Sequence, residues 1–192
     1  MTENPDSPLS RPKDTAFPVV VGTADWQNPG WWGTYYPPDL PPEWRLAFYA
    51  NDFSGVLIPA TTWRSTDPSR VEKWRQDTPE DFAIFLETEE DGDTAIPSIA
   101  GLLGERLAGV VTMSQSPRPG HLQGVDMAEA LRGAGQVVML SPAELEEKRK
   151  LGRDLLALAA RAEPVRALFV TGAVDASAVQ ELRLLAELTG LA

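Results

Sequence analysis

The chain has 192 residues, of which 43% are apolar and 23% are charged, with 17 basic against 28 acidic side chains. This length suffices for one well-buried domain, and the composition is typical of a globular protein. The formal net charge of −11 disfavours nucleic-acid binding, because that affinity comes largely from Lys and Arg on phosphates. The absence of cysteine excludes disulfides, thiolate catalysis and cysteine-ligated metal centres.

The sequence predicts no targeting signal. No apolar run approaches the roughly 20 residues that span a bilayer, and the N-terminus has neither the basic nor the apolar segment of a signal peptide. We therefore expect no membrane partner and a cytoplasmic location. Residues 1–17 are rich in Pro, Ser and charge, which predicts a flexible tail ahead of a single domain over residues 18–192.

Short apolar runs recur along the rest of the chain, and each is continuous rather than alternating. They lie at residues 19–21, 56–58, 83–86, 109–111, 137–140 and 167–170. Continuous hydrophobicity is typical of strands that are covered on both faces, as in a parallel sheet. Helical patterns follow these runs in turn, at residues 43–51, 68–76, 98–107, 126–132, 143–162 and 176–189.

The last two helical segments carry the clearest signals. Ser141–Pro142 provides an N-cap and a first-turn proline for one of them. In the other, Val179, Leu182 and Leu185 share one stripe, and Gly190 stands where the helix should end. The repeated order of strand and helix predicts an α/β fold with a TIM-barrel-like parallel sheet. About six strand-helix units, where a full barrel has eight, predict a reduced or incomplete barrel.

Glycine, aromatic and proline residues after the first predicted strand carry a family resemblance. Gly22–Trp26 is followed by Pro29–Trp31 and then by Tyr35–Pro37. This order resembles the YecE-like family, domain of unknown function 72, whose opening segment reads Gly-Thr-Ser-Gly-Trp, a further Trp, and Phe-Tyr-Pro. The resemblance implies a barrel of parallel strands and helices, and it implies no established chemistry.

The chain departs from the family pattern where the family carries polar groups. Residues 56–64 correspond to the family's Val-Glu-Ile-Asn-x-Thr-Phe-Tyr-Arg, but Leu57 and Pro59 replace the acid and the amide. Glu87 stands in the place of a Lys, and the Thr-His pair that follows it in the family has no counterpart. Val138–Ser141 replaces a Glu-x-Arg-His segment. The resemblance therefore implies a shortened relative that has lost part of its polar site.

Residues near the carboxyl ends of the first three predicted strands form our candidate ligand-binding site, because these ends meet at one rim. The candidates are Asp25, Trp26, Trp32, Thr61, Trp63, Arg64 and Glu87. Arg64 beside Trp63 combines an anion-binding fork with an aromatic face. Alternatively, Arg64 forms a structural ion pair with Asp25 or Glu87. The aromatic cluster between residues 26 and 36 is either a stacking surface or a packed loop.

Other polar groups give weaker signals. His121 is the only histidine, so one chain cannot build a multi-histidine metal centre, and its proline-rich surroundings indicate a solvated loop. The acidic run at residues 87–93 could hold Ca²⁺ or Mg²⁺ but is better explained as a surface loop. Lys148–Lys150, flanked by glutamates, predicts a solvated helix face. We expect no cofactor and no bound transition metal.

Two classes of function remain. The first is a noncatalytic barrel relative that binds a small ligand or a protein partner, which the lost polar groups support. The second is a hydrolase-type enzyme, in which Asp25 or Glu87 acts as general base and Arg64 stabilises negative charge. A shortened sheet would also leave strand edges or an apolar flank exposed, which predicts a homo-oligomer.

Overall fold

The computed structural model describes residues 19–89, 93–112, 123–128, 135–162 and 164–191. The predicted tail at residues 1–17, His121 and residues 90–92 of the acidic run lie outside this part of the chain. Within it, no helix is long and apolar enough to cross a membrane.

In the described part of the chain, one sheet of seven strands forms the centre of the fold, in the order β1-β7-β6-β5-β4-β3-β2. The strands are β1 (Val20–Thr23), β2 (Gly55–Ile58), β3 (Ala83–Thr88), β4 (Leu107–Thr112), β5 (Gln123–Ala128), β6 (Gln136–Leu140) and β7 (Val165–Val170). Every neighbouring pair is parallel except those that involve β5, which runs antiparallel to both β4 and β6. The six parallel strands all coincide with the apolar runs of the sequence.

Strand β5 corrects the helix predicted at residues 126–132, because residues 126–128 belong to this strand. Val125 and Met127 alternate with Gly124 and Asp126, which is the two-residue period of a strand. Such a segment lacks the continuous apolar run that marks the other strands. The remaining residues of that predicted helix, 129–134, lie outside the described part of the chain.

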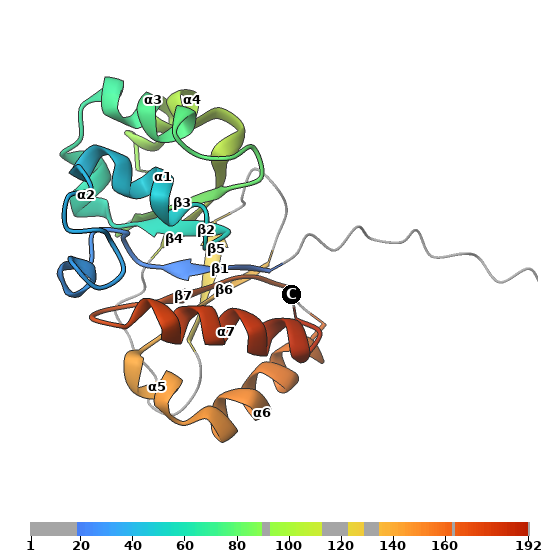
Figure 1. Cartoon of the computed structure of the whole chain (residues 1–192). Helices are drawn as coiled ribbons and strands as arrows, with labels where there is room; N and C mark the ends of the chain where they lie inside the picture. Colours follow the sequence, from blue (N-terminus) through green and yellow to red (C-terminus); the bar gives the residue numbers. More distant parts are fainter. Residues whose placement is uncertain (1–18, 90–92, 113–122, 129–134, 163, 192) are drawn as a thin grey trace, which may run out of the picture.

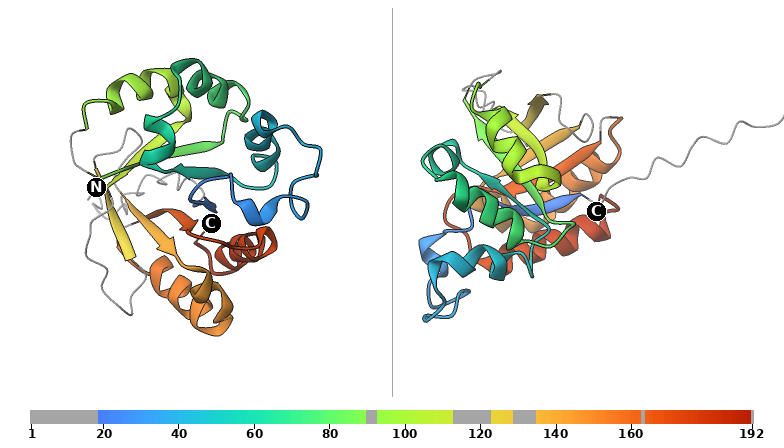
Figure 2. Two further views of the ribbon diagram at one scale, coloured as in Figure 1. Left: turned by 90° about the vertical axis from the view of Figure 1, so that its left-hand side faces the viewer. Right: turned by 90° about the horizontal axis from the view of Figure 1, so that it is seen from above.

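The two strands at the ends of the sheet order also meet. A parallel bridge joins Ala24 to Leu57, and the backbone N–H of Asp25 donates to the carbonyl of Leu57 at 2.8 Å. The sheet thus curls back on itself, with β1 beside β2 (Figure 2). Over the described residues, the result is a reduced TIM-barrel-like α/β fold of seven strands.

Helices cover the outside of this sheet, with α1 to α4 on one side and α5 to α7 on the other (Figure 1). They are α1 (Arg45–Tyr49), α2 (Ala60–Arg64), α3 (Pro68–Gln76), α4 (Ile96–Leu103), α5 (Pro142–Glu146), α6 (Lys148–Ala159) and α7 (Ala176–Leu188). Short 3-10 helices lie at Pro29–Trp31, Pro42–Trp44 and Gly104–Arg106. The helix predicted at residues 143–162 is thus two helices, which part at Glu147.

Helix α2 is not among the helices that the sequence predicted. Pro59 precedes it with φ −57°, and proline suits the start of a helix because its φ is fixed and its N–H is absent. The N–H groups of Thr62 and Trp63 both donate to the carbonyl of Pro59. Residues 60–64 therefore present their side chains around a helical turn.

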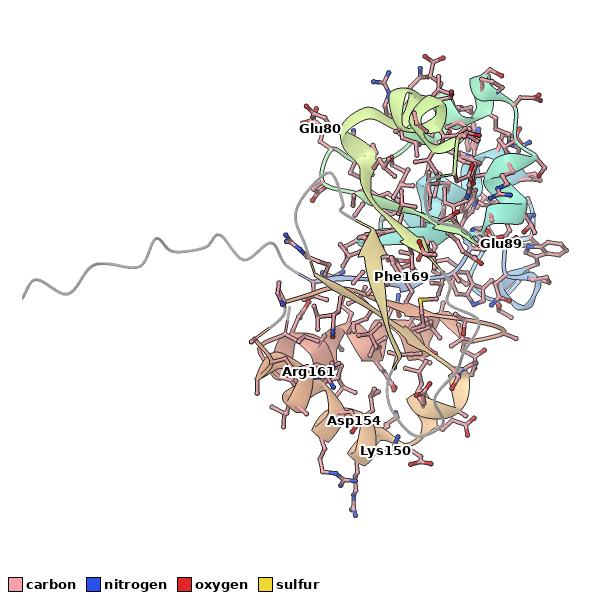
Figure 3. The ribbon with its side chains drawn as sticks, turned by 180° about the vertical axis from the view of Figure 1, so that it is seen from behind. Glu80, Glu89, Lys150, Asp154, Arg161 and Phe169 are labelled. Carbon is pink, nitrogen blue, oxygen red and sulfur yellow. The ribbon has the colours of Figure 1, made fainter. Side chains whose placement is uncertain are left out.

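Two apolar clusters hold the barrel together. The larger one lies between the strands and the helices. The smaller one consists of strand residues that alternate with those of the larger cluster, so it fills the interior: Leu57, Ala83, Phe85, Val111, Val137, Met139, Ala167 and Phe169. The rings of Phe85 and Phe169 meet edge to face at 5.2 Å, and Figure 3 shows Phe169 near the middle of the molecule. The interior is a packed apolar core.

Candidate functional site

Asp25 forms the turn that follows β1. It is the one non-glycine residue with positive φ, +69°, in the described part of the chain, a conformation that Asp tolerates better than most residues. Its carboxylate accepts a hydrogen bond from the N–H of Gln27 at 2.9 Å, and its carbonyl accepts one from the hydroxyl of Thr23 at 2.6 Å. The side chain of Asp25 is therefore engaged within its own turn.

Trp63 anchors α2 to the sheet. Its side chain is only 1% exposed, and its indole N–H donates to the carbonyl of Glu87 at 2.8 Å. The bond ties the helix after β2 to the carboxyl end of β3. Trp63 is therefore a core residue, and the face of its ring is not open to solvent.

Arg64 forms its ion pair with Asp93, and not with Asp25 or Glu87. Its guanidinium also lies 5.2 Å from the centre of the Trp63 ring. The pKa of Asp93 is lowered, first because the N–H of Ala95 donates to its carboxylate and also because Arg64 lies beside it. Arg64 thus holds the segment that follows β3, and about half of its side chain stays exposed.

Glu87 lies at the interior mouth of the barrel. It is two residues beyond Phe85 on β3 and so shares the inward face of that strand. Burial raises the pKa of its carboxyl group, and Glu89 adds to the shift. No described residue donates a hydrogen bond to this carboxylate. The interior below it is apolar, and Leu57 occupies part of that space.

The aromatic cluster after β1 divides into packed and exposed rings. Trp31 is buried and donates its indole N–H to the carbonyl of Val174 at 2.6 Å, while the hydroxyl of Tyr36 donates to the carbonyl of Trp26 at 2.6 Å. Trp32 differs, because 55% of it is exposed and the guanidinium of Arg45 lies 5.0 Å from its ring centre. Most of the cluster thus packs the loop against the barrel.

A pocket of about 340 Å³ lies beside α2, and we call it the α2 pocket. It is lined by Trp26, Gln27, Thr61, Thr62, Ser65, Thr66, Asp67, Arg70 and Trp74. Two of the seven candidate residues, Trp26 and Thr61, belong to this lining. The other lining residues were not predicted as site residues. The hydroxyl residues at 61, 62, 65 and 66 nevertheless have the spacing of one helix face.

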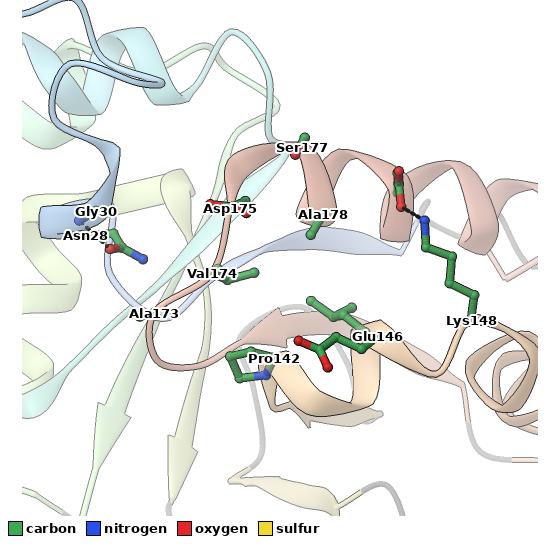
Figure 4. A pocket seen from close by; sticks show the side chains of 12 residues that line it. Asn28, Gly30, Pro142, Glu146, Lys148, Ala173, Val174, Asp175, Ser177 and Ala178 are labelled. Carbon is green, nitrogen blue, oxygen red and sulfur yellow. Dashed lines mark hydrogen bonds and ion pairs between the residues drawn. The ribbon is translucent and has the colours of Figure 1, made fainter.

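A second pocket, of about 370 Å³, lies between α5, α7 and the turn at residues 28–30 (Figure 4). Its lining contains none of the candidate residues, and Lys148 pairs with Glu181 at one end. Asp25, Arg64 and Glu87 line neither of these two pockets. No group of three His, Cys, Asp or Glu residues suited to a metal ion occurs in the described ranges.

A reduced, mostly parallel β/α barrel with a filled interior is therefore the class of protein that the geometry defines. Residues 20–90 match the model of a family described as protein of unknown function DUF72. The fold also resembles the crystal structure of a DUF72 family protein from Thermotoga maritima MSB8, with a TM-score of 0.59 and 16% identity over 89% of this chain and 100% of that chain. Over residues 20–90 the chain is therefore similar to the DUF72 family, and its fold is similar to that of a DUF72 protein. No curated protein matches its sequence.

Proposed function

We propose that this protein is a noncatalytic barrel relative that binds a small ligand in the α2 pocket. The observation that carries the proposal is the polar lining of this pocket beside the buried ring of Trp26. Small-ligand sites combine an enclosed aromatic or apolar wall with a few polar groups that fix orientation. In this pocket Trp26 supplies an aromatic wall and Thr61 supplies a polar group. Binding of a protein partner and association with a second copy of the chain stay predictions.

The apolar barrel interior supports the noncatalytic part of the proposal. Barrel enzymes assemble their catalytic groups from the ends of several strands. Here Asp25 is engaged in its own turn and Arg64 is paired with Asp93, so neither is free to act with Glu87. A lone carboxyl group above a packed core lacks the second group that hydrolysis requires.

A bulky substitution tests the α2 pocket as the binding site. Thr61→Tyr should fill the pocket, whereas Gln76→Tyr changes an exposed residue of α3 that does not line it. In a thermal-shift screen of small molecules, a ligand at 100 times its Kd should stabilise the wild type by about 2.7 kcal/mol. We expect Thr61→Tyr to lose this stabilisation and Gln76→Tyr to keep it. Equal stabilisation of both variants would place the ligand elsewhere.

Removal of the Arg64 side chain should change stability little. The pair with Asp93 is partly exposed, and exposed ion pairs contribute about 0–1 kcal/mol. We therefore expect Arg64→Ala to lower the free energy of unfolding by no more than about 1 kcal/mol. Lys73→Ala breaks a similarly exposed pair with Asp77 and serves as the control in the same urea titration. A loss several times that of the control would make Arg64 a structural residue.

The hydrolase alternative has one observation in its favour, which is the raised pKa of Glu87. A desolvated carboxyl group is a common general acid or base. Under this alternative, turnover of an ester or phosphoester substrate would vanish in Glu87→Gln while the melting temperature stayed unchanged. We expect no such turnover in the wild type.

The same substitution gives a pH-dependent stability effect. Because burial raises the pKa of Glu87 above its ordinary value of 4.5, the folded state holds this proton more tightly than the unfolded chain does. The stability that the protonated Glu87 contributes is therefore fully present below pH 4.5 and is lost as pH rises through the native pKa of this group. The stabilisation by Glu87→Gln should therefore grow as pH rises from 4.5 through the native pKa of Glu87. Exposed Glu72→Gln is the control, and a pH-independent gain at Glu87 would contradict the prediction.

A further inference from the structure

We infer that the α2 pocket binds an oxyanion group of its ligand, either a carboxylate or a phosphate. The inference rests on the proposed function and names the chemistry that the pocket selects. It follows from an excess of hydrogen-bond donors over acceptors in the lining, from two buried indoles without acceptors, and from an uncapped helix end.

Two tryptophans that line the pocket have unused donors. Trp26 and Trp74 are 4% and 5% exposed, and their rings meet edge to face at 5.4 Å. Trp31 and Trp63 donate their indole N–H groups to backbone carbonyls, but no described residue accepts one from Trp26 or Trp74. Neither nitrogen is among the fully buried polar atoms without a partner, so both reach solvent. The space that both side chains border is the α2 pocket.

The N-terminus of α3 reaches the same pocket. Asp67 is the N-cap residue, yet its side chain makes no capping hydrogen bond. The N–H groups of Arg70 and Val71 donate to the carbonyl of Asp67, Pro68 has no N–H, and the N–H of Ser69 has no acceptor among the described residues. The first turn of a helix carries a partial positive charge and favours anions when its N–H groups are not satisfied.

Arg70 adds a full positive charge to this lining. No carboxylate in the described ranges lies within ion-pair distance of it, including the nearby Asp67. Its guanidinium can therefore offer a two-pronged contact to a carboxylate or a phosphate.

Hydroxyl groups complete the set of donors. Ser65 and Thr66 already donate to the carbonyls of Thr61 and Thr62, which leaves those two hydroxyls as acceptors. The hydroxyls of Thr61 and Thr62 have no partner among the described residues and can donate. Asp67 is the one carboxylate of the lining. A neutral sugar presents many hydroxyl donors and would need more acceptors than this, whereas an oxyanion uses donors alone.

The indole N–H signals in a ¹⁵N–¹H NMR spectrum of the full chain test the inference. Inorganic phosphate, acetate and glucose are added separately, and the signals are assigned with Trp26→Phe and Trp74→Phe. The chain has six tryptophans, so the signals of Trp32 and Trp44 report binding elsewhere. We expect phosphate or acetate to shift the Trp26 and Trp74 signals, and the anion that shifts them at lower concentration identifies the group.

A matched pair of arginine variants tests the charge. Arg70→Gln removes a lining residue, and Arg75→Gln makes the same change on α3 outside the lining. We expect Arg70→Gln to weaken the anion by roughly 10- to 100-fold, as for loss of a charged hydrogen bond, and Arg75→Gln to have little effect. Equal weakening by both variants would reduce the binding to nonspecific charge attraction and overturn the inference.

The glucose arm separates the inference from the proposed function. If glucose shifts the two indole signals and neither anion does, the ligand class is wrong and the pocket still binds a ligand. If no probe shifts them, the oxyanion inference is overturned, and the proposed function is then decided by the thermal-shift screen with Thr61→Tyr.

Discussion

Trp63→Ala is expected to lower the free energy of unfolding by about 3–5 kcal/mol, as measured by urea denaturation. The side chain is 1% exposed, so its removal leaves a cavity between α2 and the sheet. It also leaves the carbonyl of Glu87 without the hydrogen bond it now accepts at 2.8 Å. Trp44→Ala is the matched control, because Trp44 is 61% exposed and surface substitutions usually change stability by no more than about 0.5 kcal/mol.

Trp63→Phe divides this effect into packing and hydrogen bonding. The phenyl ring keeps most of the contact area but cannot donate a hydrogen bond. The carbonyl of Glu87 is then buried without a partner, which should lower the free energy of unfolding by about 1–3 kcal/mol. A stability loss in Trp63→Ala no larger than that in Trp44→Ala would contradict the buried position of Trp63. It would also restore Trp63 as a residue that offers its ring to a ligand.

The strands were the most predictable part of the fold. Val56–Ile58 and Val137–Leu140 are apolar at every position because helices cover one face and the barrel interior covers the other. Strand β5 runs antiparallel to both of its neighbours, β4 and β6. Its sequence alternates in polarity, so it lacks the continuous apolar run that marks the other strands. The bridge between Ala24 and Leu57 depends on the curvature of the whole sheet, which no local pattern encodes.

Only a small part of the α2 pocket could be predicted: Trp26 and Thr61 follow β1 and β2 and line it, whereas the other five candidate residues do not. Residues 60–64 form a helix, in which side chains two positions apart point in nearly opposite directions. Thr61 therefore lines the pocket while Trp63 is buried against the sheet. Trp74 and Arg70 reach the pocket from α3, and their contribution depends on how that helix packs. Asp93 could not be predicted as the partner of Arg64, because the two residues meet only through the loop after β3.

Gly22→Ala is expected to destabilise the protein by at least about 3 kcal/mol or to prevent folding. A methyl group on Gly22 would lie 2.0 Å from the carbonyl oxygen of Gly55 and 2.8 Å from the hydroxyl of Tyr49. Neither can give way easily, since Gly55 is strand backbone and the Tyr49 hydroxyl bonds both the N–H of Thr23 and the carbonyl of Gly55. Overpacking against backbone therefore forces β1 and β2 apart.

Gly152→Ala supplies the control for this prediction. Gly152 lies inside α6, and a methyl group there would meet nothing within 4 Å. Alanine should stabilise that helix by about 0.5–1 kcal/mol, because glycine loses more backbone freedom on folding. The two substitutions thus have opposite expected signs in one denaturation experiment. If Gly22→Ala matched the wild type, β1 and β2 would not approach as closely as the bridge between Ala24 and Leu57 requires, and the sheet would be open at this edge.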